Sequence, residues 1–283
     1  MNDTQLDMVK ALREKTAISL AQCQRAITES NGDMDKAISL LKIWGSLKGA
    51  EKASQLALEG KVIAFANNFL KTAAIVEINC QTEACAKTDQ FTDFCKEYVK
   101  SIVVDNEFGS HSIDDDRHLL IAKTGENVII RRSDKMVAKN DDDIYYSSYN
   151  HTGDRLGVIV EFGIPRTLSD NKEFQEFAQD VAMQVAAATP TVVVASEIPE
   201  TVVSDQKTIV LAQLKAEGKP EASWDKIMPG KMAKWRSTIV LLEQECVQDN
   251  KKTIDQKRQE ISKTIGGEVV IKRFVRYTLG EAS

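Results

Sequence analysis

The chain has 283 residues and is mildly acidic, with 42 Asp and Glu against 37 Lys and Arg and a formal net charge of −5 at pH 7. An acidic protein is not drawn by its overall field to nucleic acid or to an anionic membrane, so neither is expected as the main partner. Only three His and five Cys are present, at irregular spacings, which leaves little material for a zinc site or a Cys–His catalytic pair.

Targeting signals are not visible either. The N-terminus lacks the basic start and apolar run of a signal peptide, and no stretch approaches the roughly 18 apolar residues of a membrane span. Five cysteines at irregular positions fit free thiols in a reducing compartment better than a disulfide framework. The sequence therefore predicts a soluble cytoplasmic protein.

Residues 1–55 are predicted to form a small helical module, because apolar residues recur there at spacings of three and four. The three stripes are Met8, Val9 and Leu12; Leu20, Cys23, Ala26 and Ile27; and Met34, Ala37, Ile38, Leu41 and Trp44. Helices of about ten residues are not stable alone, so they must pack into a three-helix bundle. Such a bundle has no room for a buried active site and is typical of binding. A helical connector is expected over 46–60, ending at Gly60.

Residues 56–143 are predicted to form a strand–strand–helix subdomain. Strands are expected at 61–65 and 72–78, on either side of a turn signal at Asn67 and Asn68. A loop over 79–87 follows, and then a helical apolar stripe at Phe91, Phe94, Cys95, Tyr98, Val99 and Ile102. This region also carries the acidic excess, because residues 62–143 hold 15 acidic and 10 basic side chains.

The same order recurs further along the chain. Strands are predicted at 144–149 and 156–160, followed by a helix with the apolar stripe Phe174, Phe177, Ala178, Val181 and Val185. The two units are therefore expected to be related α+β subdomains, although no likeness is visible between their sequences.

The C-terminal third is predicted to contain a helical hairpin and a return to the second sheet. Two largely polar helices at 200–217 and 222–239 surround a turn, so the hairpin is expected to protrude. A helix at 253–265 and a strand at 268–279 complete the second subdomain. The predicted fold is α+β, divided into 1–55, 56–143, 144–192 with 242–283, and the hairpin at 193–241.

Motifs for nucleotide or metal chemistry do not occur. Neither G-x-x-x-x-G-K-[ST] nor G-x-G-x-x-G is present, so the chain itself is not expected to bind a nucleotide. Cys80 and Cys85 lack a fourth ligand and regular pair spacing, and are interpreted as structural thiols. The three-Asp runs at 114–116 and 141–143 lack the Gly and Glu of a calcium loop and are interpreted as solvated acidic turns.

Two segments are expected to present side chains at the surface. His151 lies in a polar turn between two strands, with Asp154 nearby, and is either a binding contact or a plain surface residue. The loop at 79–87 joins a strand to a helix and is rich in small and polar residues.

Several motifs, taken in chain order, resemble the elongation factor Ts family. They are 9–16 (VKALREKT) with Cys23 and 31–33 (NGD), 77–82 (EINCQT), 125–132 (GENVIIRR), 148–151 (SYNH), 181–187 (VAMQVAA), 218–220 (GKP), 242–244 (LEQ) and Arg273-Phe274. Each motif is weak alone, but their order over nearly the whole chain makes an accidental match improbable.

The resemblance implies a guanine-nucleotide exchange factor for the GTPase elongation factor Tu, with no covalent chemistry, no cofactor and no metal. The N-terminal module, similar to a ubiquitin-associated domain, would dock on the G domain of the GTPase. The loop after Cys80 would push side chains beside the magnesium site, the second subdomain would contact the far domain, and the hairpin would add an accessory contact. A homodimer or a heterotetramer with the GTPase is also possible. The implied contact residues are Leu20, Ala21, Gln24, Thr82, Glu83, Ala84, Cys85, Gly125, His151 and Val247.

Departures from the family pattern fall in the contact regions. Where the family has Thr-Asp-Phe-Val-Ala, this chain has TEACA at 82–86, so the aromatic wedge is replaced by Ala84 and the charge is kept by Glu83. The family's Thr-Gly-Ala-Gly followed by two Met is TAISLA at 16–21, and Gln24 replaces a Lys. Three hypotheses stay open: an active exchange factor whose GTPase has changed to match, an attenuated relative that binds without efficient exchange, and a module for an unrelated protein partner.

Overall fold

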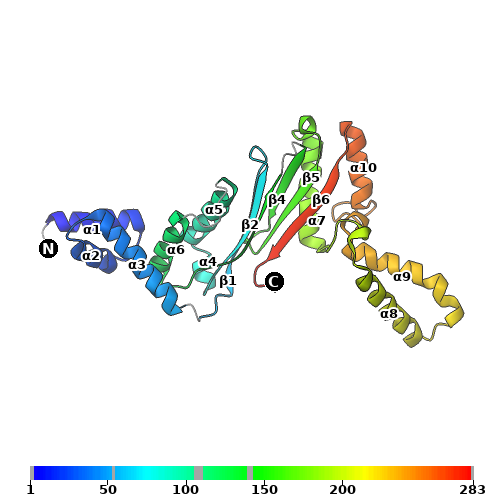
Figure 1. Ribbon diagram of the computed structural model, residues 1–283, viewed down its shortest axis with the longest axis horizontal. Helices are drawn as coiled ribbons and strands as arrows, with labels where there is room; N and C mark the ends of the chain where they lie inside the picture. The colour runs from blue at the N-terminus through cyan, green and yellow to red at the C-terminus, as the bar shows by residue number, and fades with distance from the viewer. Residues whose placement is uncertain (1–2, 53–54, 105–110, 139–142, 282–283) are drawn as a thin grey trace.

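The computed structural model describes residues 3–52, 55–104, 111–138 and 143–281 as an elongated molecule, with the N-terminal helices at one end and two sheets in the middle (Figure 1). The three predicted N-terminal helices are confirmed as α1 (Asp3–Thr16), α2 (Leu20–Glu29) and α3 (Met34–Lys52). They pack around a shared core that includes Leu12 and Leu41.

The helical connector expected over 46–60 is confirmed as far as Lys52, where α3 ends, but its predicted end at Gly60 is wrong. Strand β1 (Glu59–Asn67) already begins at Glu59. Gly60 therefore lies in a strand rather than at a helix end. Its φ is +147°, and a Cβ placed there would approach the Ile78 carbonyl oxygen to 2.1 Å, so the position admits only glycine.

The first sheet is antiparallel in the order β1-β2-β3, with β2 at Thr72–Cys80 and β3 at Ile129–Val137. One face is covered by α5 (Asp89–Val104) and by buried side chains of α6 (His111–Thr124). The hairpin and α5 confirm the prediction, whereas α6 and β3 were not predicted.

The acidic run at 114–116 is not a turn but part of α6. Asp114 stands in the first turn of that helix, where a carboxylate is favoured by the partial positive charge of the helix N-terminus. Asp141 and Asp142, two residues of the other acidic run, lie outside the described residues.

The second sheet has the order β4-β5-β6, formed by Ile144–Asn150, Leu156–Gly163 and Val270–Thr278. The chain thus returns at its end to this sheet, as predicted. Helices α7 (Lys172–Ala188) and α10 (Ile254–Ile265) pack on the outer face of the sheet.

The two sheets share a likeness that the linear sequence hides. Each central strand carries an Ile-Val-Glu segment, ending at Glu77 in β2 and at Glu161 in β5. Each Glu stands opposite an arginine of the third strand, Arg132 and Arg273, and a register shift follows each Glu. This matched detail supports the expected relation between the two subdomains.

The inner faces of the sheets pack against each other, so the core is a four-layer sandwich of helices, sheet, sheet and helices (Figure 1). Val62 and Ile75 from the first sheet meet Ile159 and Tyr277 from the second. Strand β2 is buried along its whole length because both of its faces are covered.

Two asparagine side chains join edge strand β4 to the β1 hairpin. Asn150 accepts from the Ala64 N–H at 2.7 Å and donates to the Ala64 carbonyl at 2.8 Å. Asn68 makes the same pair of bonds with Tyr146, at 2.7 and 3.0 Å. The amides thereby satisfy backbone groups that edge strands otherwise leave unpaired.

The predicted helical hairpin is formed by α8 (Glu200–Ala216) and α9 (Trp224–Ile239), which pack on each other around Leu214 and Met232. In Figure 1 it extends away from the sheets. Short helices complete the fold at α4 (Glu83–Ala86) and at the 3-10 turns Arg166–Leu168, Ala195–Glu197, Glu221–Ser223 and Leu241–Glu243. Within the described ranges, no helix combines the length and apolar character needed to cross a membrane.

Candidate partner-binding surfaces

The segment after β2, expected to be a loop, contains a single helical turn, α4. Thr82 caps this turn, because its hydroxyl oxygen accepts from the Cys85 N–H at 3.2 Å. Cys85 and Ala86 are buried, whereas Glu83 and Ala84 face solvent. The turn is therefore anchored in the core by Cys85 and Ala86 and presents Glu83 and Ala84 to solvent. We call residues 81–87 the contact loop.

Glu126, for which the sequence predicts no role, holds the contact loop in place. Its carboxylate accepts from the Gln81 and Thr82 N–H groups at 3.1 and 3.0 Å and from the Thr82 hydroxyl at 2.6 Å. Charge-assisted bonds of this kind are about twice as strong as neutral ones. The available signal was its place beside Gly125 in the GENVIIRR motif.

Gly125 has a structural role at this site. It follows α6 with φ +72°, and its N–H donates to the Ile121 carbonyl at 2.9 Å, so it ends the helix in the left-handed conformation. The Lys52 ammonium donates to its carbonyl. The turn at Gly125 places the next residue, Glu126, under the contact loop.

The contact loop presents an exposed ion pair between Glu83 and Lys87. The hydrogen bond from Lys87, at 2.7 Å, and the charge of that side chain hold the pKa of Glu83 below its usual range. Glu83 is thus ionised near neutral pH, and a partner that binds its exposed carboxylate competes with Lys87 for it.

A second surface lies on α2 in the N-terminal module. Leu20, Ala21 and Gln24 share one exposed face of this helix, opposite its buried side, and the Leu20 side chain is 46% exposed. Ser19 caps the helix, since its hydroxyl accepts from the Gln22 N–H at 3.4 Å.

His151 and Val247 come together at a third surface, although they are far apart in the sequence. Both line a cavity of about 270 Å³ between the β4–β5 turn, α7 and the segment before α10. A hydrogen bond of 2.9 Å joins the His151 Nδ1 to the Tyr149 hydroxyl, and Val247 is 65% exposed. The Val247 N–H donates to the buried Gln184 at 2.8 Å, which fixes the segment.

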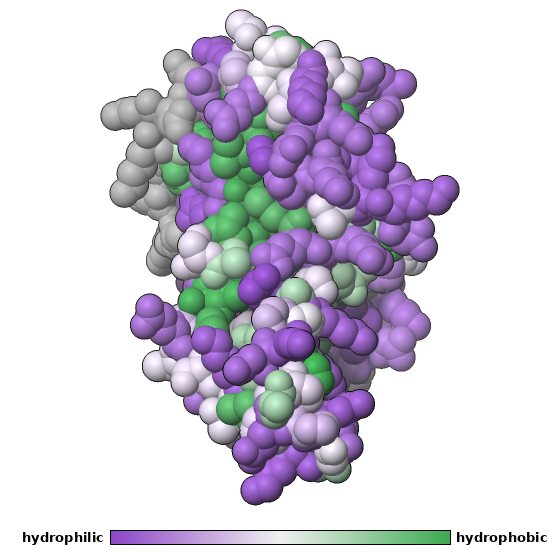
Figure 2. Space-filling view, turned by 90° about the vertical axis from the view of Figure 1, so that its right-hand side faces the viewer, coloured by the Kyte–Doolittle hydropathy of each residue, from purple (hydrophilic) through white to green (hydrophobic). Residues whose placement is uncertain are grey.

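This cavity lies among mainly apolar walls with a few polar groups, which suits docking of a side chain. Further lining residues are Leu156, Phe177, Met183, Ala186, Ala187, Cys246 and Ile254. Figure 2 shows the side of the molecule that carries α10 and the hairpin, where apolar side chains gather in a strip bordered by polar ones.

The predicted contact residues thus fall into three surfaces: the α2 face, the contact loop with Gly125, and the cavity with His151 and Val247. Comparison with known proteins identifies the family of the chain. The family model described as Elongation factor TS matches residues 81–281. The chain belongs to the elongation factor Ts family.

Relatives in the family match nearly the whole chain. Elongation factor Ts of Nautilia profundicola is 35% identical, over 97% of this chain and 92% of the relative. That of Clostridium perfringens strain SM101 is 34% identical, over 96% and 92%, and that of Chloroherpeton thalassium is 31% identical, over 96% and 97%. As a member of this family, the chain is a nucleotide exchange factor for elongation factor Tu in translation elongation and not an enzyme.

Proposed function

We propose that this chain drives GDP release from elongation factor Tu through its three surfaces, with the contact loop entering beside the magnesium and nucleotide site. The observation that carries this proposal is the presentation of the contact loop: Glu83 and Ala84 are exposed while Cys85 is buried beneath them. A loop fixed in this way can insert its outer side chains without having to order itself first, which lowers the cost of binding.

Exchange follows from reciprocal coupling rather than from covalent chemistry. A factor that binds the nucleotide-free GTPase more tightly than the GDP-bound form weakens GDP binding by the same factor. Each tenfold change in GDP affinity corresponds to a difference of about 1.4 kcal/mol in the free energy with which the factor binds the two forms of the GTPase. The exposed Glu83 carboxylate would supply such a contact, because a carboxylate placed near the nucleotide competes with its phosphate groups for the magnesium ion.

The other two surfaces supply binding that positions the contact loop. Leu20, Ala21 and Gln24 would dock on the G domain, and the cavity with His151 and Val247 would receive a side chain of the far domain. The chain divides for this purpose into a docking module (1–55), two core subdomains (56–143, and 144–192 with 242–283) and an accessory hairpin (193–241). Translation would place the complex in the cytoplasm, as a simple pair, a homodimer or a heterotetramer.

The test is the rate of GDP release from the cognate elongation factor Tu, followed with a fluorescent GDP analogue. Added in increasing amounts, the chain should accelerate release, and Glu83→Gln should reduce the acceleration. Unchanged release with the GTPase demonstrably bound would contradict the proposal.

A second candidate function is an attenuated relative that binds elongation factor Tu as a chaperone or regulator. It is favoured by Ala84, an exposed methyl group where the family has a Phe wedge. Restoring the ring in Ala84→Phe should then raise exchange by roughly 30- to 1,000-fold, the equivalent of about 2–4 kcal/mol for a buried aromatic anchor.

The matched control is Thr264→Phe, which adds the same ring at an exposed position of α10 outside the three surfaces and the hairpin. It should leave exchange unchanged. Rapid GDP release by the unmodified chain would rule out the attenuated account and support a GTPase that has changed to match Ala84.

A further inference from the structure

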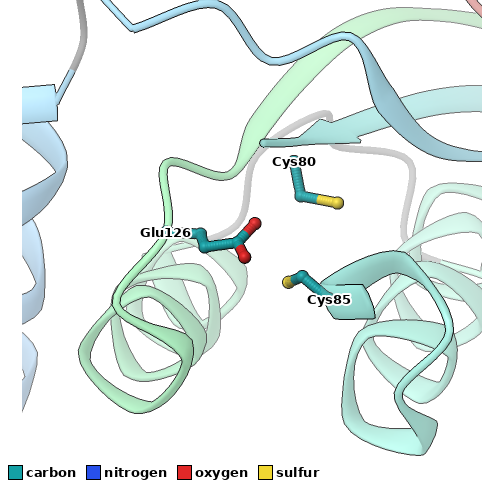
Figure 3. A group of neighbouring side chains, drawn as sticks. All are labelled: Cys80, Cys85 and Glu126. Atoms are coloured by element: carbon teal, nitrogen blue, oxygen red, sulfur yellow. The ribbon is translucent and has the colours of Figure 1, made fainter. Parts of the chain in front are cut away.

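Two cysteines and a glutamate from three segments meet beneath the contact loop. Cys80 ends β2, Cys85 lies on α4, and Glu126 lies between α6 and β3. The two sulfur atoms and a carboxylate oxygen all lie within 4.8 Å of one another. Figure 3 shows the Glu126 carboxylate and the Cys85 thiol reaching toward each other, with the Cys80 thiol beside them.

The spacing is close to that of a metal site. In a tetrahedral zinc site with Zn–S near 2.3 Å and Zn–O near 2.0–2.2 Å, neighbouring ligand atoms stand roughly 3.5–3.8 Å apart. Ligand atoms within 4.8 Å can reach this arrangement by small side-chain rotations. A disulfide needs the two sulfurs at about 2.05 Å, which is a larger displacement.

The three groups sit on three separate segments that one bound cation would tie together. The Cys80 thiol donates to the Thr82 carbonyl at 3.3 Å, a weak bond that metal binding would replace.

We propose that Cys80, Cys85 and Glu126 bind a thiophilic divalent cation such as Zn²⁺. Three protein ligands leave a fourth position for water or for a partner group. The position opens on the solvent side, because Glu126 is half-buried and Thr82 is exposed, whereas both cysteines are buried.

Binding is an exchange of protons for the cation, with no change of oxidation state. The two thiols lose their protons to solvent, and both sulfurs and one Glu126 oxygen bond the metal. The cation then ties the end of β2, helix α4 and the α6–β3 connection together under the exposed Glu83 and Ala84. This site does not depend on the proposed exchange function, and it is measured on the isolated chain.

The test is titration of the fully reduced, metal-free protein with Zn²⁺ by calorimetry, and with Co²⁺ by absorption. One Zn²⁺ should bind per chain, with about two protons released near neutral pH, and Co²⁺ should show thiolate charge-transfer bands. Ca²⁺ and Mg²⁺, which prefer oxygen ligands, should not compete. Affinity should fall as the pH is lowered, because protons compete for the thiolates.

The deciding variant is Cys85→Val, which removes the thiol and keeps the core filled. It should weaken Zn²⁺ binding by at least roughly 100-fold, since loss of an outer-shell partner alone costs 10- to 100-fold. Glu126→Gln should weaken binding less than Cys85→Val. The matched control is Cys246→Ala, which removes a buried thiol of the other subdomain and should leave binding unchanged.

Three results would count against the proposal. One is the absence of Zn²⁺ binding to the reduced chain. Another is equal binding by the unmodified chain and Cys85→Val, which would place the metal elsewhere. A Cys80–Cys85 disulfide that forms readily in the presence of saturating Zn²⁺ would also count against it, because bound thiolates are protected from oxidation.

Discussion

Glu77 is a fully buried carboxylate between the two sheets, and its bonds hold the C-terminal segment onto the first sheet. It accepts from Arg131 and Arg132 at 2.7 and 2.6 Å and from the Gly280 N–H at 2.9 Å. Arg132 also donates to the Thr278 carbonyl at 2.9 Å. Burial acts to raise the pKa of Glu77, but the Gly280 N–H and the two guanidinium groups outweigh it, so the pKa is lowered.

We expect Glu77→Gln to reduce the free energy of unfolding by about 3 kcal/mol at pH 7. Removing one partner of a buried ion pair costs about 3–5 kcal/mol, and the lower end applies because the Arg131 side chain is 30% exposed. Urea unfolding measures the loss. The matched control is Glu161→Gln in the second sheet, whose partner Arg273 is 54% exposed, so that its loss should be smaller.

The same variant carries a pH prediction. Because the pKa of folded Glu77 lies below its ordinary value of 4.5, its stabilisation is complete above that pH and is lost as the pH falls through the folded pKa. The difference in unfolding free energy between the wild type and Glu77→Gln should therefore shrink as the pH is lowered. A difference that stays constant down to about pH 3 would mean that the charge of Glu77 contributes nothing.

Ala17 stands where the family has glycine, and the structure retains the left-handed turn there, with φ +50°. A residue with a Cβ in the left-handed region raises the free energy of the folded state by roughly 1–2 kcal/mol. A glycine instead loses about 0.5–1 kcal/mol more than alanine in backbone conformational entropy on folding. Ala17 is exposed, so no packing is lost on removing its methyl group. We expect Ala17→Gly to stabilise the N-terminal module by about 0.5–1 kcal/mol.

Trp44 in α3 reports unfolding of this module once Trp224 and Trp235 of the hairpin are replaced by Phe. The control is Asn31→Gly in the same module. Asn31 is also left-handed, at φ +52°, but asparagine tolerates that region, so this change should have little effect. A destabilising Ala17→Gly would show that the turn is not strained.

At the scale of elements, the periodic segments were predictable and the doubly packed ones were not. Helix α6 sends Ile113 and Ile121 into the first core and Ala122 into the N-terminal core. A helix buried on two sides loses the single apolar stripe from which α5 was predicted. Strand β3 is rich in charged residues, and Glu77 of the neighbouring strand pairs with two of its arginines. Strand β3 is therefore recognised by its pairing with Glu77 of β2 and not by an apolar pattern in its own sequence.

The contact loop shows the same limit at a candidate site. Family resemblance located residues 82–85 and Gly125, but Glu126 joins Thr82 across 44 residues of sequence, a contact that no local pattern encodes. The closeness of the Cys80 and Cys85 thiols to that carboxylate could not be predicted either. Metal-site motifs are recognised by the spacing of ligands along the chain, and Glu126 reaches the two cysteines only through the tertiary fold. Exposure of Leu20 and Val247, by contrast, agrees with their expected role as contacts.

Across the whole molecule, the parts differ in how firmly they are joined. The N-terminal helices share buried side chains with α6, and the two sheets share a continuous core. The hairpin has its own small core, and its ends are brought together by the pairing of Val192 with Val240 and by the Leu241 N–H, which donates to the Val192 carbonyl at 2.9 Å. The end of α9 is also held by the Thr191 N–H, which donates to the Ile239 carbonyl at 2.9 Å, and by the Gln244 side-chain amide, which donates to the Thr238 carbonyl at 3.0 Å. Arg236 adds a half-exposed ion pair with Glu243 at 3.3 Å.

Replacing residues 199–236 by a Gly-Ser linker of about four residues should therefore leave the sandwich folded. Packed helices lie about 8–10 Å apart, a gap that such a linker spans. An exposed ion pair contributes about 0–1 kcal/mol, so the melting temperature of the core should change by no more than roughly 4 °C. Leu214→Asp in the full chain is the control, since it disrupts the hairpin core alone. If both variants lower the core transition by ten degrees or more, the hairpin belongs to the fold. If neither does, the hairpin is not needed for folding, and GDP release with the shortened chain measures what it contributes to the contact with the partner.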